Sequence, residues 1–152
     1  MKKSQNSENF SPELPFSSSP QTTIEIKECV RYSETDQMGV AHNKNYFEWF
    51  EIGRTEFCRQ KGIPYKKIED RGFFLVVVEA FCRYKRALRY DDTFFIQVTL
   101  QEITSKKVVF SYQILSENKK QIMAKGYTTH IVTNAKTIVC KFPDDIIQKL
   151  KN

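Results

Sequence analysis

Long apolar runs are missing from this chain of 152 residues. No stretch of about 18 apolar residues occurs, so we expect no transmembrane helix. The first 21 residues have a basic tip without an apolar segment behind it, which argues against a secretory signal. Because residues 1–21 are rich in Ser, Pro and Asn, we predict a flexible tail there, followed by one folded domain over 22–152.

Cysteine and histidine are also scarce. The four cysteines are widely spaced and include no CxxC pair, which argues against a disulfide framework and a metal site. We interpret them as reduced thiols of a cytoplasmic protein; they are Cys29, Cys58, Cys82 and Cys140. The two histidines, His42 and His130, lie far apart without a nearby cysteine, so no metal is expected. His130 alternates with strand residues and is interpreted as structural.

Charge of one sign is in excess, because the formal net charge is +6 and the pI is near 9.1. This balance suits either an anionic partner or simply a solvated surface rich in lysine. The lysines occur as scattered doublets and not as one stripe. A nucleic-acid-binding module would need a clustered basic face, so the sequence argues against that function.

Apolar periodicity predicts a strand and then a long helix. Residues 23–32 alternate apolar residues such as Ile24 and Ile26 with charged ones, as a strand with one buried face does. After a polar loop, apolar residues recur at three- and four-residue steps, the spacing of one helical face; they are Tyr46, Trp49, Phe50, Gly53 and Phe57. Asn43 or Asn45 can cap the start of this helix, and Gly62 can end it.

The rest of the chain is predicted to be mostly strand. Pro64 suits the first turn of a short helix over 64–70. Apolar segments follow, separated by short polar breaks that are typical of antiparallel hairpins; they span 73–85, 93–103, 107–116, 121–133 and 137–141. Pro143 opens a closing helix with an acidic first turn.

This order, a strand, a long helix, a short helix and then four or five antiparallel strands, predicts an α+β fold. A long helix that is apolar on most sides must be covered by the sheet, and we expect burial on more than one side. A parallel nucleotide-binding sheet would need helices between the strands, and the sequence predicts none there. No internal repeat is found.

The element order and the segment RYSETDQMGVAHNKNYFEWFEIGRTEF, residues 31–57, together resemble the hotdog-fold acyl-CoA thioesterases of the 4-hydroxybenzoyl-CoA thioesterase type. The resemblance covers roughly residues 24–150, with weaker matches in YKRALRYDD (84–92), GYTTHIVTN (126–134) and KFPDDI (141–146). It implies a hotdog fold, in which a curled antiparallel sheet wraps around one long central helix.

Asp36 is the candidate catalytic residue. On the sequence alone, an aspartate three residues before Gly39 can be just a turn former. The resemblance implies more, because the catalytic carboxylate of the family matches Asp36. That carboxylate would act as general base on a water molecule or as nucleophile on the thioester carbonyl.

The resemblance also implies a substrate-binding set of Tyr32, Gly39, His42 and Asn43. Near Asn43, a main-chain N–H at the helix start would stabilise the oxyanion. Many relatives have histidine at this position, whereas here the stretch reads VAHNKNY, so no imidazole role is carried over to Asn43. His42 is either a site residue or a polar residue before the helix, and Tyr32 lines the pocket or is a half-buried strand aromatic. Gly39 is expected to adopt a positive φ or to allow close substrate approach.

Other residues have two interpretations each. Some hotdog thioesterases use a glutamate of the central helix, so Glu51 is a second candidate carboxylate, although a structural polar contact is the simpler role. Four basic residues could bind the phosphates of coenzyme A or simply face solvent; they are Arg83, Lys85, Arg86 and Arg89. Phe47, Trp49 and Phe50 could line an acyl tunnel or pack in the core. Glu34 and Glu48 are expected to face solvent or to cap.

The sequence therefore predicts an acyl-CoA thioesterase, a hydrolase with coenzyme A thioester as substrate, no cofactor and no metal. The resemblance implies a homodimer or homotetramer with sites between subunits. Alternatives are a non-catalytic acyl-CoA-binding hotdog protein and a thioesterase acting on acyl carrier protein.

Overall fold

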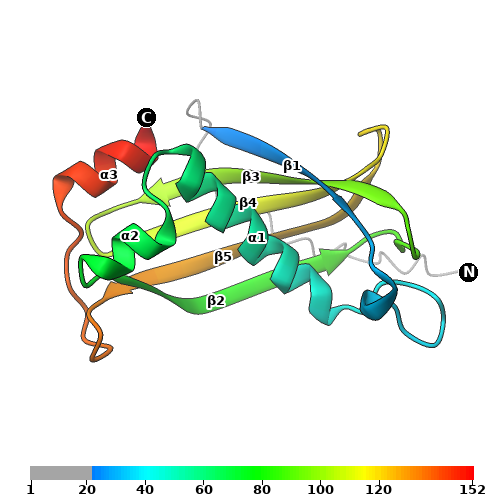
Figure 1. The fold of residues 1–152 in the computed structure, drawn as a ribbon, viewed down its shortest axis with the longest axis horizontal. Helices are drawn as coiled ribbons and strands as arrows, with labels where there is room; N and C mark the ends of the chain where they lie inside the picture. The colour runs from blue at the N-terminus through cyan, green and yellow to red at the C-terminus, as the bar shows by residue number, and fades with distance from the viewer. Residues whose placement is uncertain (1–21) are drawn as a thin grey trace, which may run out of the picture.

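The computed structural model describes residues 22–152, so the tail predicted for residues 1–21 lies outside the described residues. Figure 1 shows an antiparallel sheet with one long helix packed across it. The strands are β1 (Thr23–Cys29), β2 (Phe74–Tyr84), β3 (Thr93–Ile103), β4 (Lys107–Ser116) and β5 (Ile122–Thr133). The helices are α1 (Lys44–Gln60), α2 (Tyr65–Asp70), α3 (Asp144–Lys151) and a short 3-10 helix, Tyr32–Glu34. The predicted α+β class, a curled sheet around a central helix, is confirmed.

The strand order in the sheet is β1-β3-β4-β5-β2, and all four pairings are antiparallel. Only β3–β4 and β4–β5 are hairpins of consecutive strands. The expectation of a hairpin between β2 and β3 was wrong, because these strands lie far apart in the sheet (Figure 1). Their connection, residues 85–92, buries Leu88 and pairs Arg89 with Val40 of the loop before α1.

Helix α1 packs on the sheet through one face. Gly53 allows the close approach, because a side chain there would overlap Val98 and Ile96 of β3. Beside it, the ring of Phe50 stacks on Tyr112 of β4, with ring centroids 4.3 Å apart. The other side of the helix is open, and Phe47 is exposed. The expected burial on more than one side is therefore not observed within residues 22–152, because the sheet covers one face only.

The C-terminal part departs from prediction at one segment. Residues 137–141 form no strand; a single bridge joins Val139 to Thr133. The short helix α2 follows Pro64, and α3 follows Pro143, as the two prolines predicted. Among the described helices, none has the length and apolar character needed to cross a bilayer.

A buried polar cluster lies between α1 and the sheet. The Tyr112 hydroxyl and Nε2 of His130 are 2.6 and 2.8 Å from the Thr128 hydroxyl. Burial, reinforced by the Arg54 guanidinium, lowers the pKa of His130 to about 3, so its ring is neutral. His130 therefore contributes to the interior, in agreement with a structural role.

Candidate active site

The loop between the 3-10 helix and α1 is built around Asp36. Its Oδ1 accepts hydrogen bonds from the main-chain N–H groups of Met38 (2.8 Å) and Val40 (3.4 Å). The main chain closes the same turn, since Gly39 N donates to Asp36 O at 3.0 Å and Gly39 has a φ of +76°. The positive φ expected for Gly39 is confirmed. Within residues 22–152, Oδ2 of Asp36 accepts no hydrogen bond, so one carboxylate oxygen is fixed and the other is available.

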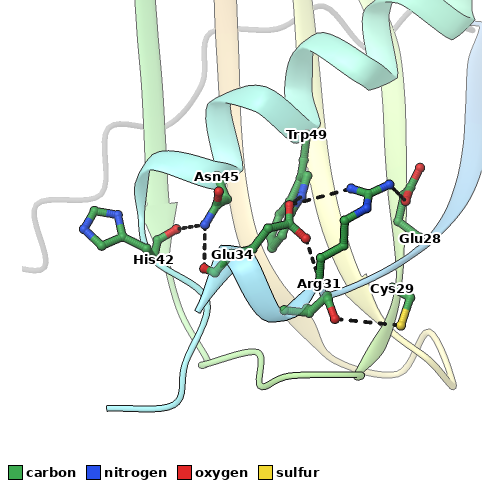
Figure 2. A network of polar contacts seen from close by, with 8 residues as sticks. Glu28, Cys29, Arg31, Glu34, His42, Asn45 and Trp49 are labelled. Atoms are coloured by element: carbon green, nitrogen blue, oxygen red, sulfur yellow. Dashed lines mark hydrogen bonds and ion pairs between the residues drawn. The ribbon is translucent and has the colours of Figure 1, made fainter. Parts of the chain in front are cut away.

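Glu34 fastens this loop to α1 (Figure 2). Its carboxylate accepts hydrogen bonds from the Trp49 indole (2.8 Å) and from the main-chain N–H of Arg31 (2.7 Å). Its main-chain oxygen accepts two more, from His42 N at 2.8 Å and from Asn45 Nδ2 at 2.7 Å. Glu34 is buried, so the expected solvent-facing position was wrong, although it does cap the 3-10 helix. The residues before and after Asp36 are thereby held on the first turns of the helix.

The start of α1 is capped by a residue that the sequence did not indicate. Asn43 occupies the N-cap position but makes no capping side-chain bond, and Asn45 uses its amide to donate to Glu34 and His42. Instead, His42 Nδ1 accepts from Lys44 N at 3.1 Å. The predicted asparagine cap was wrong because Asn43 already has helical dihedrals (φ −55°, ψ −31°), which turn its side chain away from the next N–H groups. Among the described residues, the Asn43 main-chain N–H has no acceptor.

A cavity of about 380 Å³ brings these groups together. It is lined by Asp36, Val40, Ala41, His42, Asn43, Tyr46, Tyr84, Lys85, Arg86 and Ala87. Two tyrosines form one wall, with rings edge to face at 4.8 Å, and the Tyr84 hydroxyl donates to Asn43 O at 3.2 Å. Burial raises the pKa of both tyrosines to about 12, so they are neutral hydrogen-bond donors at physiological pH. The cavity thus combines a carboxylate, a helix N-terminus, two phenols and two cations.

Several predicted site residues lie elsewhere in this chain. Tyr32 is 78% exposed in the 3-10 helix and packs edge to face on Tyr90, so it is neither in the cavity nor a half-buried strand aromatic. Glu51 points outward from α1, with its side chain 69% exposed, 3.8 Å from Arg54. Gly39 and the two arginines Arg83 and Arg89 are also absent from the lining of the cavity.

Sequence reasoning missed the tyrosine wall. The spacing of Tyr46 indicates only the apolar face of the helix, and Tyr84 lies in a segment whose pattern indicates only a strand. Trp49 and Phe50 are fully buried core residues, and Phe47 is exposed; none of the three lines the cavity. In the described chain, no three His, Cys, Asp or Glu side chains lie close enough together to hold a metal ion.

The sequence matches the Thioesterase-like superfamily over residues 30–150. A protein of Aquifex aeolicus named "Putative esterase" is 39% identical over 124 residues, which cover 81% of this chain and 94% of that protein. A chloroplast acyl-acyl carrier protein thioesterase of Arabidopsis thaliana is 30% identical over 105 residues, covering 68% of this chain and 54% of that one.

A similar fold occurs in the crystal structure of a DHNA-CoA thioesterase from Staphylococcus aureus, with a TM-score of 0.78 and 24% identity over 84% of this chain and 90% of that one. The match over residues 30–150 spans nearly all of the domain that contains the Asp36 cavity. This chain therefore belongs to the Thioesterase-like superfamily of hotdog proteins.

Proposed function

We propose that this protein is an acyl-CoA thioesterase, which hydrolyses a thioester to a carboxylic acid and coenzyme A. The observation that carries the proposal is the shared cavity of Asp36 and Asn43. It offers one free carboxylate oxygen and one main-chain N–H without an acceptor among the described residues. A thioesterase needs these two groups, a base or nucleophile and a donor for the developing oxyanion.

In the proposed reaction, the thioester carbonyl oxygen accepts a hydrogen bond from Asn43 N–H. Negative charge develops on that oxygen as the carbonyl carbon becomes tetrahedral, and the positive end of the α1 dipole stabilises it. Stabilisation by a main-chain donor does not depend on the side chain, which agrees with an asparagine where relatives have histidine.

Asp36 supplies the attack in one of two ways. As general base, Oδ2 takes a proton from a water molecule whose oxygen bonds to the carbonyl carbon; the C–S bond then breaks and the thiolate takes up a proton. As nucleophile, Oδ2 itself bonds to the carbonyl carbon and expels the thiolate, and water then hydrolyses the anhydride. His42 Nδ1 already accepts a bond, so His42 would contribute an Nε2–H donor to the substrate.

Release of free thiol from a panel of acyl-CoAs tests this proposal. Asp36→Asn keeps an oxygen that can accept from Met38 and Val40, so the turn should survive while the carboxylate is lost. We expect kcat to fall at least about 100-fold. Glu51→Gln tests the second candidate carboxylate and should retain activity, because Glu51 points away from the cavity.

The alternatives give different outcomes in the same assay. Full turnover by Asp36→Asn would refute the assignment of Asp36. An absence of turnover by the wild type on every acyl-CoA, together with tight binding of these compounds, would favour a non-catalytic acyl-CoA-binding protein. The free-thiol readout also works with acyl carrier protein thioesters.

We further propose that the protein is a homodimer or homotetramer in the cytoplasm, as the resemblance and the cysteine pattern predicted. The outer edge of β2 supports assembly, since β2 pairs only with β5 among the described strands. Val77 and Val78 on β2 are exposed, and an unprotected apolar edge strand favours pairing with another chain. Light scattering should give an oligomer for the wild type and a smaller species for Val78→Lys; a monomeric wild type would contradict the proposal.

A further inference from the structure

A second hollow, of about 630 Å³, adjoins the candidate active site. It is lined by Lys85, Arg86, Lys120, Gln121 and Ile122. Lys85 and Arg86 line both this hollow and the Asp36 cavity, so the two depressions meet at these two side chains. A ligand longer than the cavity could therefore continue from one into the other.

The main chain holds both walls of this hollow in place. Lys85 N and Arg86 N both donate to Met123 O, at 2.9 and 3.0 Å, which ties the segment after β2 to the start of β5. On the other wall, Lys120 belongs to the β4–β5 turn, and its N–H donates to Asn118 Oδ1 at 2.9 Å. The cations therefore lie on two segments that are distant in sequence, and hydrogen bonds from main-chain N–H groups hold each segment in place.

The three cations that line the hollow are not neutralised by acidic side chains of the described chain. None of Lys85, Arg86 and Lys120 forms an ion pair with an acidic residue of the described chain. Lys119, next to Lys120 in the same turn, differs: it pairs with Glu25 and lies 4.3 Å from the centre of the Phe95 ring. Three positive charges thus face one concavity without a carboxylate to neutralise them, which predicts an anionic ligand of more than one charge.

We infer that this hollow binds the phosphorylated nucleotide of coenzyme A, an inference that rests on the proposed thioesterase function. With the thioester in the Asp36 cavity, the pantetheine arm would leave past Lys85 and Arg86. Coenzyme A then presents a diphosphate and a 3′-phosphate to the three cations, and Ile122 offers an apolar contact for the adenine. Acyl carrier protein presents a single phosphodiester on a convex protein surface, which fits a multiply charged concavity less well. Lys120 thus favours coenzyme A over acyl carrier protein as the carrier of the thioester.

Binding of coenzyme A by calorimetry tests the inference without requiring turnover. Lys120→Glu should weaken coenzyme A binding about tenfold or more, because it replaces a charge-assisted contact by repulsion. Pantetheine, which lacks the nucleotide, should bind equally to both forms. Lys119→Glu is the matched control: it makes the same charge reversal in the same turn, at a side chain that contacts Glu25 and Phe95 and does not line the hollow.

Unchanged binding of coenzyme A by Lys120→Glu, or equal weakening by both variants, would overturn the inference, as would a wild type that does not bind coenzyme A. So would a variant that loses affinity for acyl carrier protein but not for coenzyme A. Thiol release by the wild type from an acyl-pantetheine tests the thioesterase function separately, so that failure of the nucleotide site and failure of the enzyme are distinguishable.

Discussion

Glu34→Gln replaces a carboxylate that accepts two hydrogen bonds by an amide that can accept at one end only. In the native protein, Oε2 accepts from the Trp49 indole and Oε1 from the main-chain N–H of Arg31. In the variant, the amide NH₂ must face one of these donors. Glu34 is only 7% exposed, so water cannot readily take the place of the lost acceptor.

Loss of a hydrogen bond to a charged group costs about 1.5–3 kcal/mol. We therefore expect the free energy of unfolding to fall by about 2 kcal/mol. The melting temperature should fall by roughly 6–10 °C for a domain of this size. Urea denaturation followed by far-UV circular dichroism measures the change. Glu117→Gln, in the exposed β4–β5 turn, is the control and should stay within about 0.5 kcal/mol of the wild type.

A double-mutant cycle with Trp49→Phe makes the test specific to this bond. The cycle uses Glu34→Leu, because leucine cannot accept from the Trp49 indole. Glu34→Leu and Trp49→Phe then each remove the same hydrogen bond, so their combination should cost about 1–2 kcal/mol less than the sum of the two. Strict additivity, or a Glu34→Gln protein as stable as the Glu117→Gln control, would refute the role given to the Glu34 carboxylate.

Two further perturbations test the interior. The pKa of His130 is held at about 3 in the folded protein, below its ordinary 6.5, so only the unfolded chain takes up this proton between those values. This contribution to stability is present above pH 6.5 and is lost as the pH falls. Urea titrations at pH 4–6 give the free energy of unfolding as a function of pH. Its slope should be about 1.4 kcal/mol per pH unit shallower for His130→Gln than for the wild type. Equal slopes would contradict the buried neutral ring. Gly126→Ala would force a methyl group into Phe81 O and the Phe50 ring. Thermal denaturation should therefore show that the free energy of unfolding falls by about 3 kcal/mol. A variant as stable as the wild type would mean that the helix and sheet can separate there at little cost.

The helices and strands could be predicted because their signals are local. The alternation around Ile24 and Ile26 and the helical spacing of Tyr46 and Trp49 each involve neighbours within one element. The order of the strands has no such signal. The polar breaks suggested a chain of hairpins, whereas β2 lies at the edge of the sheet opposite β1 and pairs with β5. That placement depends on contacts between segments that are distant in sequence.

The site was predicted unevenly for the same reason. Asp36 and Asn43 came from the resemblance, and the cavity contains both. The capping role of Glu34 could be predicted, but its burial could not, because its neighbours in sequence are polar and its indole partner lies fifteen residues later. Lys120 lines the same hollow as Lys85 and Arg86 because the sheet brings the β4–β5 turn close to the segment after β2. These two segments are distant in sequence, so no local pattern predicts their proximity.

Trp49 is the single tryptophan of the chain, and it lies 1% exposed under the loop that carries the proposed base. The intrinsic tryptophan fluorescence of the protein therefore reports on the point where the loop meets the helix. Its emission should shift when that junction loosens, so local opening of the loop can be followed in the unlabelled protein.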